Sequence, residues 1–222
     1  MATKLFSYVL RYDDGAAPNP FWKTCTLTIC KPDIRRTATV GDWVIGTGSK
    51  NSKLKDGNTY DLSDSIVYAM KITKKLTLSE YDKYCQKYLP NKIPKWFSRN
   101  FGMRMGDCIY DFSNGEPPRL RKSIHTEENR KRDLRGKYSL LSKYYYYFGE
   151  EARPIPQELK HIIRRGQKHL VFDDPLLIIE FEKWISQFTK NKIYADPQLK
   201  YDFSLGSDEE QISKCSKRHL ED

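Results

Sequence analysis

Short apolar strands alternate with polar, glycine-punctuated loops through the first seventy residues, and this pattern constrains the fold more than any other feature of the chain. Side chains alternate in the manner of half-buried strands over residues 5–11, 24–29, 42–47 and 65–72. Polar loops follow the first three of these strands. We therefore expect a β core with three loops at one rim, an arrangement typical of a binding site.

Helices are expected mainly in the second half of the chain. Thr77 and Glu80 form a capping box before a helical pattern that Pro90 ends. Asp174 and Pro175 suit the start of a helix with a wide apolar stripe. A brief helix over residues 156–165 and strands over 106–110 and 144–148 complete the prediction. The expected fold class is α+β, with a curved or barrel-like mixed β-sheet core and peripheral helices.

Length and composition predict one globular domain. The 222 residues suit a single domain over residues 1–203, followed by a polar, mobile tail over 204–222. The chain has no apolar run of membrane-spanning length and begins without a secretory signal pattern, so we expect a cytoplasmic protein. Its five cysteines are scattered, which fits a reducing compartment and indicates neither a disulfide framework nor a zinc site.

The charge of the chain favours a polyanionic partner. Lys and Arg number 39 against 29 Asp and Glu, for a net charge of +10. Nine basic and three acidic residues fall in the basic segment 119–143, which precedes a run of four tyrosines. Such a segment can follow a phosphate backbone while nearby aromatic rings stack on bases. The alternative is a solvated charged loop followed by a core strand.

Candidate ligands for phosphate lie in residues 31–36, where we expect a rigid proline turn to hold Lys31, Arg35 and Arg36. Arginine forks bind phosphate or carboxylate bidentately. The same cations could instead form a surface salt network with Asp13, Asp14 and Asp33.

Further candidates for binding a nucleotide or nucleic acid differ in their expected roles. Asn19 and Ser49 could contact a base or sugar, although Asn19 lies between two prolines and also suits an ordinary turn. Arg121, Arg132 and Arg135 are candidates for contact with the sugar-phosphate backbone of a nucleic-acid strand. The remaining candidates are Tyr146 for stacking on a base, His125 as an acid, base or contact, and Asp14 in the first loop.

Several familiar sites are excluded by spacing. The glycines at 41–48 match neither a phosphate-binding loop nor a dinucleotide fingerprint. The four histidines lack the spacing of a metal site, so we predict no metal, and the sequence indicates no particular cofactor. No G-x-S-x-G elbow is present, and spacing alone identifies no catalytic residue.

A succession of motifs carries a resemblance to a known family. In order they are Y-D-D-G-A-A-P-N-P, T-L-T-I-C-K-P-D-I-R-R, G-D-W-V-I-G-T-G-S, D-L-R-G-K-Y-S-L-L-S, Y-Y-Y-F-G and I-P-Q-E-L. Over about residues 5–171 the chain resembles the second of the nucleotide modification associated domain families, found in bacteria and bacteriophages. The resemblance implies a role in making or recognising hypermodified DNA bases.

A second likeness is to the PUA-like superfamily of EVE, ASCH and YTH domains. It rests on G-D-W-V at 41–44 and I-V-Y-A-M at 66–70. It implies a small barrel that holds a modified base in a pocket, although the basic segment and the C-terminal helices depart from a compact reader of this type.

Three hypotheses follow. The first is a protein that binds DNA or a nucleotide and recognises a modified base through its loop rim and basic segment. The second is an enzyme that transfers a group to a base or nucleotide, with Asp13, Asp14 or His125 moving a proton. The third is a scaffold in a modification or defence complex that presents the helix from Pro175 to a protein partner. The sequence leaves the oligomeric state open.

Overall fold

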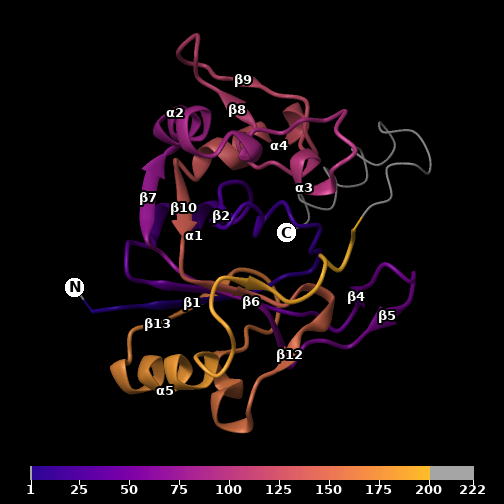
Figure 1. Ribbon diagram of the computed structural model, residues 1–222. Helices are drawn as coiled ribbons and strands as arrows, with labels where there is room; N and C mark the ends of the chain where they lie inside the picture. Colours follow the sequence, from indigo (N-terminus) through magenta and orange to yellow (C-terminus); the bar gives the residue numbers. More distant parts are fainter. Residues whose placement is uncertain (1, 201–222) are drawn as a thin grey trace. The chain divides into compact units, whose positions relative to one another are not determined.

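The computed structural model describes residues 2–200, which form two compact units (Figure 1). The first unit contains residues 2–13, 38–74 and 142–199, and the second contains residues 14–37 and 75–141 together with Lys200. The predicted tail over 204–222 lies outside the described residues. The chain thus passes from one unit to the other several times, and each unit is described by itself.

The first unit is built on a mixed seven-stranded sheet. Its strands follow the order β13-β1-β3-β6-β11-β14, and β12 pairs with β6. β1 runs parallel to β3, whereas β6 runs antiparallel to both of its neighbours, β3 and β11. The bounds are β1 (Leu5–Val9), β3 (Trp43–Thr47), β6 (Ser65–Lys71), β11 (Tyr145–Tyr147), β12 (Arg153–Pro154), β13 (His169–Phe172) and β14 (Lys192–Ile193). The first unit also contains a separate hairpin of β4 (Ser52–Lys53) and β5 (Thr59–Tyr60), and the 3₁₀ helix η2 (Gly149–Glu151).

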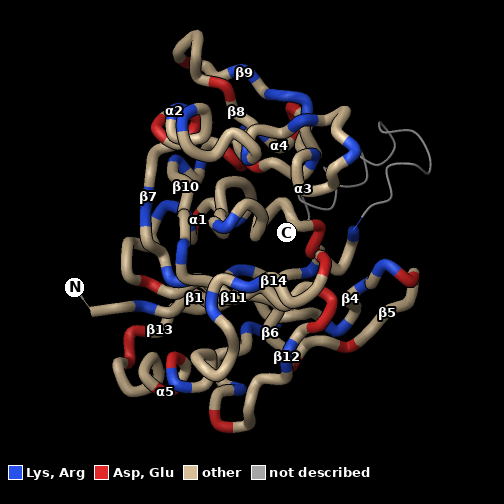
Figure 2. Tube along the Cα trace, viewed as in Figure 1, with Lys and Arg blue, Asp and Glu red and all other residues tan. Residues whose placement is uncertain are grey.

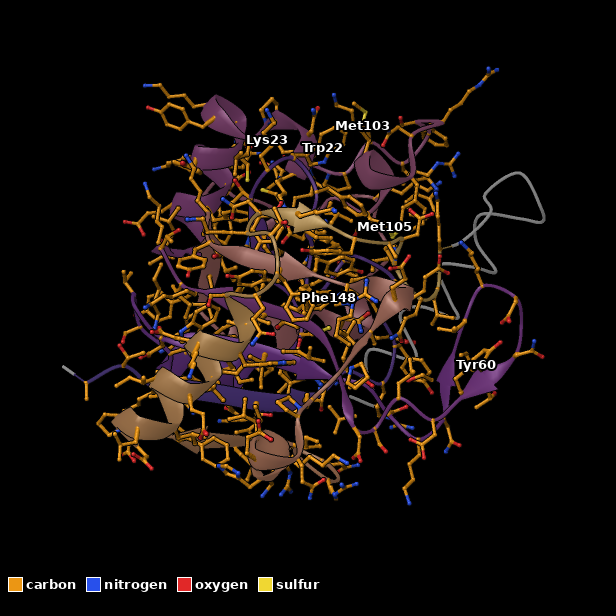
Figure 3. All side chains as sticks on the ribbon, turned by 60° about the horizontal axis from the view of Figure 1, so that its bottom comes forward. Trp22, Lys23, Tyr60, Met103, Met105 and Phe148 are labelled. Atoms are coloured by element: carbon orange, nitrogen blue, oxygen red, sulfur yellow. The ribbon has the colours of Figure 1, made fainter. Side chains whose placement is uncertain are left out.

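The core of the first unit lies between this sheet and α5 (Pro175–Ile185), which runs along one face of it (Figure 1). Trp43 is fully buried, and its ring meets Phe181 of α5 edge-on at 5.3 Å. Its indole Nε1 donates a hydrogen bond of 2.8 Å to Glu182, which also accepts one from Lys71. Phe148 lies among the side chains of this core (Figure 3). The polar end of the tryptophan is therefore satisfied while its apolar body anchors the helix.

The second unit combines a small sheet with short helices. The strands β2 (Cys25–Leu27), β10 (Tyr138–Ser142) and β7 (Lys74–Thr77) form a sheet in that order, and β8 (Tyr110–Asp111) pairs with β9 (Arg119–Leu120). The helices are α1 (Pro32–Thr37), α2 (Leu78–Tyr88), α3 (Phe101–Arg104) and α4 (Glu127–Arg135), with the 3₁₀ helix η1 (Pro90–Lys92). α1 packs against α4. This contact joins two segments that are almost a hundred residues apart in the sequence.

The predicted α+β class with a mixed sheet is confirmed, but the sheet does not close. Its strand path ends at β13 on one side and at β14 on the other, so the barrel-like closure was wrong. The likeness to PUA-like domains stays a prediction. The four early strands are confirmed within two residues at each end, and the capping box of Thr77 and Glu80 forms as predicted.

Two local predictions need correction. Residues 31–36 were expected as a turn, but Pro32 opens the helix α1, because proline fits the first helical position without loss of a hydrogen bond. Residues 156–165 contain the 3₁₀ helix η3 (Gln157–Ile162) rather than an α-helix. The apolar stripe of α5 is mostly buried in the first unit, with Leu177, Phe181 and Ile185 in its core. Leu176 and Ile179 of the same helix are exposed, and the scaffold hypothesis stays a prediction.

None of the helices within residues 2–200 has both the length and the apolar character to cross a membrane.

The start of α5 gives a test of the fold. Asp174 accepts a hydrogen bond of 2.9 Å from the backbone N–H of Leu176, as an N-cap residue should. Replacing Asp174 with Ala should lower the free energy of unfolding by about 1 kcal/mol, because a helix N–H loses its acceptor. Urea denaturation measures the change. The neighbouring Asp173→Ala serves as control, and an equal loss in both variants would contradict the capping role.

Candidate active site

Cys30, His125 and Asp133 lie side by side inside the second unit. The Sγ atom of Cys30 is 3.9 Å from Nε2 of His125, and the opposite ring nitrogen, Nδ1, is 2.6 Å from a carboxylate oxygen of Asp133. Cys30 and His125 are each 3% exposed, and Asp133 is 1% exposed. A thiol, an imidazole and a carboxylate in this sequence of contacts form the arrangement that activates cysteine nucleophiles.

Local structure explains why the three side chains can meet. Cys30 lies between β2 and α1 and has a positive φ of 57°, a conformation that non-glycine residues adopt rarely. His125 immediately precedes the N-cap of α4, where the backbone N–H of Thr126 donates to Oδ1 of Asn129 at 3.0 Å. Asp133 lies two turns further along α4. The contact between α1 and α4 then brings the cysteine to the histidine.

Asp133 is the centre of this arrangement. One of its oxygens, Oδ2, contacts His125 and accepts a hydrogen bond of 3.1 Å from the hydroxyl of Tyr110. The other, Oδ1, accepts one of 3.1 Å from the backbone N–H of Cys30. The same carboxylate therefore orients the imidazole and fixes the backbone of the candidate nucleophile.

Pairing of His125 with Asp133 shifts the pKa of each group in the direction that favours its charged form. Burial alone would lower the pKa of His125, but the charge and hydrogen bond of Asp133 outweigh it and raise the pKa to about 9. Burial alone would raise the pKa of Asp133, yet His125 and then Arg35 hold it below its usual value. At neutral pH the site thus contains an imidazolium beside the thiol. A cation in that position favours the reactive thiolate form of cysteine.

Arg35, predicted to bind phosphate, is instead fully buried behind this site. Its guanidinium donates to three backbone carbonyl groups, those of Cys30 at 2.7 Å, Asp133 at 2.6 Å and Tyr138 at 3.0 Å. A Cβ atom at Gly136 would come within 2.5 Å of the guanidinium, so only glycine fits there without a shift. This geometry does not suit phosphate binding. Arg35 ties the loop of Cys30 to the C-terminal end of α4.

Other predicted cations have different surroundings. Arg36 and Arg135 are both more than half exposed and share one acidic partner, Asp33, at 3.2 and 3.6 Å. Lys31 and Arg132 are partly buried in the same unit. Lys and Arg are interspersed with Asp and Glu throughout this unit (Figure 2). Arg36 of α1 and Arg135 of α4 therefore place two positive charges beside one negative charge at the surface of this unit.

The remaining predicted residues do not join this cluster. Asn19 is fully buried, and both its backbone oxygen and its Oδ1 accept hydrogen bonds from the buried Lys92, at 2.9 and 2.6 Å. Arg121 is paired with Asp82 at 2.7 Å. Asp14 accepts a hydrogen bond from the N–H of Ala16, as in a turn.

Two predicted residues belong to the first unit. Ser49 forms a local turn in which its N–H donates to the hydroxyl of Ser52 at 3.1 Å. Tyr146 is 1% exposed in the core beneath α5, so its ring is not available there for stacking on a base.

Sequence reasoning identified His125 as a possible acid or base but missed Cys30 and Asp133. Ninety-five residues separate Cys30 from His125, and no motif spans that distance. The only local signal was a cysteine shortly after a strand and two residues before a proline. Among the residues described, no group of three or more His, Cys, Asp or Glu side chains is arranged to hold a metal ion.

Comparison with known proteins gives one match. The family model described as nucleotide modification associated domain 2 matches residues 2–205, which is most of the chain and agrees with the motifs noted in the sequence. None of the curated proteins and none of the solved structures matches the chain significantly.

The ionisation of His125 can be tested directly. Replacing Asp133 with Asn removes the main group that opposes burial and leaves only Cys30, so the pKa of His125 should fall well below about 9. NMR titration of the histidine ring protons, assigned with His125→Gln, measures the change. Asp33→Asn, at an exposed acid of the same unit, should leave the pKa of His125 unchanged. A pKa that stays near 9 in Asp133→Asn would contradict the pairing.

The same pair predicts how stability depends on pH. Because the folded pKa of His125 is raised, its contribution is complete below pH 6.5 and disappears as pH rises through about 9. The expected loss for the wild type over that window is about 3 kcal/mol. Chemical denaturation at several pH values should show this fall in the wild type and a much flatter profile in Asp133→Asn.

Proposed function

The chain belongs to the family of nucleotide modification associated domain 2, and from this we propose that it is an enzyme of nucleotide modification that uses Cys30 as a covalent nucleophile. The observation that carries the proposal is the contact of Cys30 with His125 and of His125 with Asp133. Family membership supplies the pathway, and the three side chains supply the chemistry.

Each member of the cluster has a distinct role. Cys30 attacks the substrate as a thiolate, because an imidazolium at Nε2 stabilises the negative sulfur. His125 holds a proton next to the reacting atoms and exchanges it during turnover. Asp133 keeps the imidazole in one orientation and stabilises its charged form, as carboxylates do in related triads.

The enzyme hypothesis has more support than the hypothesis of a passive reader. The side chains predicted to contact a base or phosphate include Arg35, Asn19 and Arg121, and each is held by hydrogen bonds or ion pairs within the protein. A reader has no need of a thiol beside an imidazolium. The exposed pair Arg36 and Arg135 remains suited to an anionic substrate, because two guanidinium groups share a single carboxylate.

Nucleoside analysis tests the proposed function. DNA and free nucleotides from cells that express the wild-type chain should contain a modified nucleoside that is absent from cells expressing Cys30→Ser, as measured by mass spectrometry. Cys85→Ser changes another buried free cysteine of the same unit and should retain the product. The proposal fails if Cys30→Ser yields the same nucleosides as the wild type while the folded protein is present at equal levels.

The exposed arginines give a separate prediction for substrate binding. Arg36→Ala and Arg135→Ala should each weaken binding of a single-stranded oligodeoxynucleotide, and each should reduce the salt dependence by about one unit of slope in a plot of log affinity against log salt. Arg153→Ala, in the first unit, is the matched control because Arg153 is likewise paired with a surface carboxylate, that of Glu151. Fluorescence anisotropy at several salt concentrations measures the slopes. Equal slopes in all variants would show that these two arginines do not contact phosphate.

A further inference from the structure

We propose that the group carried by Cys30 is an acyl group, so that the donor substrate is an ester or amide and the enzyme passes through a thioester. This inference rests on the proposed function and specifies its chemistry. The position of the imidazole relative to the sulfur carries it: the nitrogen that faces Cys30 is 3.9 Å from Sγ, and the other nitrogen is occupied by Asp133.

A proton donor beside the sulfur distinguishes among the reactions open to a thiolate. When a thiolate adds to a ring carbon of a pyrimidine, negative charge develops on atoms across the ring, beyond the reach of an acid that contacts Sγ. Transfer of an alkyl group from a sulfonium donor releases a neutral thioether, which needs no proton. In acyl substitution the leaving nitrogen or oxygen is bonded to the same carbon that the sulfur attacks, so it departs next to Nε2 of His125.

The charge state of the pair matches this requirement. His125 is held in its protonated form by Asp133 at neutral pH, so a proton is stored where the leaving group will form, and the cation favours the thiolate form of Cys30. Tyr110 and the N–H of Cys30 donate further hydrogen bonds to the carboxylate, which help to hold Asp133 in place. The imidazole is therefore oriented to give its proton on the side of the sulfur.

The steps balance as follows. The Cys30 thiolate forms a bond to the carbonyl carbon of the donor, the bond from that carbon to the leaving nitrogen or oxygen breaks, and that atom takes the proton from Nε2. The products are a thioester on Cys30, a neutral amine or alcohol, and neutral His125. An amino or hydroxyl group of the nucleotide acceptor then attacks the thioester and gives its proton to Nε2, and the thiolate departs.

Two model esters test the acyl step and the role of the proton. The purified full chain is mixed with p-nitrophenyl acetate or phenyl acetate, and intact-protein mass spectrometry follows the addition of one acetyl group. The adduct should map to Cys30, disappear in Cys30→Ser and persist in Cys85→Ser. Phenolate is the more basic leaving group, so phenyl acetate depends more on the acid. We expect the rate loss in His125→Gln to be roughly tenfold greater for phenyl acetate than for p-nitrophenyl acetate.

The wild-type protein provides the same readout without any substitution. As pH rises through about 9 the imidazolium loses its proton, so the rate with phenyl acetate should fall relative to that with p-nitrophenyl acetate. This comparison remains valid even if His125→Gln does not fold. A ratio of the two rates that is independent of pH would overturn the role of His125 as the acid.

Alkylation by iodoacetamide separates failure of the acyl inference from failure of the proposed function. A Cys30 that iodoacetamide alkylates rapidly below pH 8, while neither ester acylates it, would overturn the acyl inference and leave a covalent role for the thiol. A Cys30 that is inert to iodoacetamide and to both esters would overturn both, since the three side chains would then form a buried structural cluster. Thioester formation on Cys30 with the expected dependence on the leaving group would support both.

Discussion

The second unit depends on one buried carboxylate, that of Asp133. An isolated charge in a protein interior is unfavourable unless other groups replace its lost hydration. Here the carboxylate is surrounded by the imidazole of His125, the hydroxyl of Tyr110 and the backbone N–H of Cys30. The buried guanidinium of Arg35 donates a hydrogen bond to the backbone carbonyl group of Asp133. These groups come from residues 30–35, from β8 and from the residue before the N-cap of α4. The charge therefore joins three separated stretches of chain.

The same physics gives the site its chemistry. A protonated imidazole in the interior is stabilised by the carboxylate beside it. The resulting cation lies next to the sulfur of Cys30 and favours its thiolate form. Removing one partner of a buried ion pair costs about 3–5 kcal/mol, whereas a well-packed apolar replacement is often neutral. A charged cluster thus contributes less to stability than its contacts suggest. Its presence beside a thiol is consistent with the reactivity proposed for Cys30.

Arg35 shows how a residue type can mislead when it is considered without its surroundings. In the sequence it stands with Lys31 and Arg36 in a cationic run that suits phosphate. In the fold its side chain lies inward, where three carbonyl groups and the close approach of Gly136 enclose the guanidinium. Its neighbour Arg36 remains at the surface beside Asp33, as a cation of such a run is expected to be. A structural arginine and a candidate ligand are thus adjacent in the sequence, and α1 was not predicted from the sequence.

Features that depend on neighbours in the chain were determined by the sequence itself. The strands of the first seventy residues, the capping box at Thr77 and the N-cap at Asp174 all follow from local periodicity or from a hydrogen bond within three residues. The motifs also identified the family. Only the tertiary structure decided that the sheet stays open, that Arg35 and Tyr146 are buried, and that Cys30 meets His125 and Asp133. The physical reason is distance: these outcomes rest on contacts between segments far apart in the chain, and local patterns carry no information about which distant segment will supply the partner.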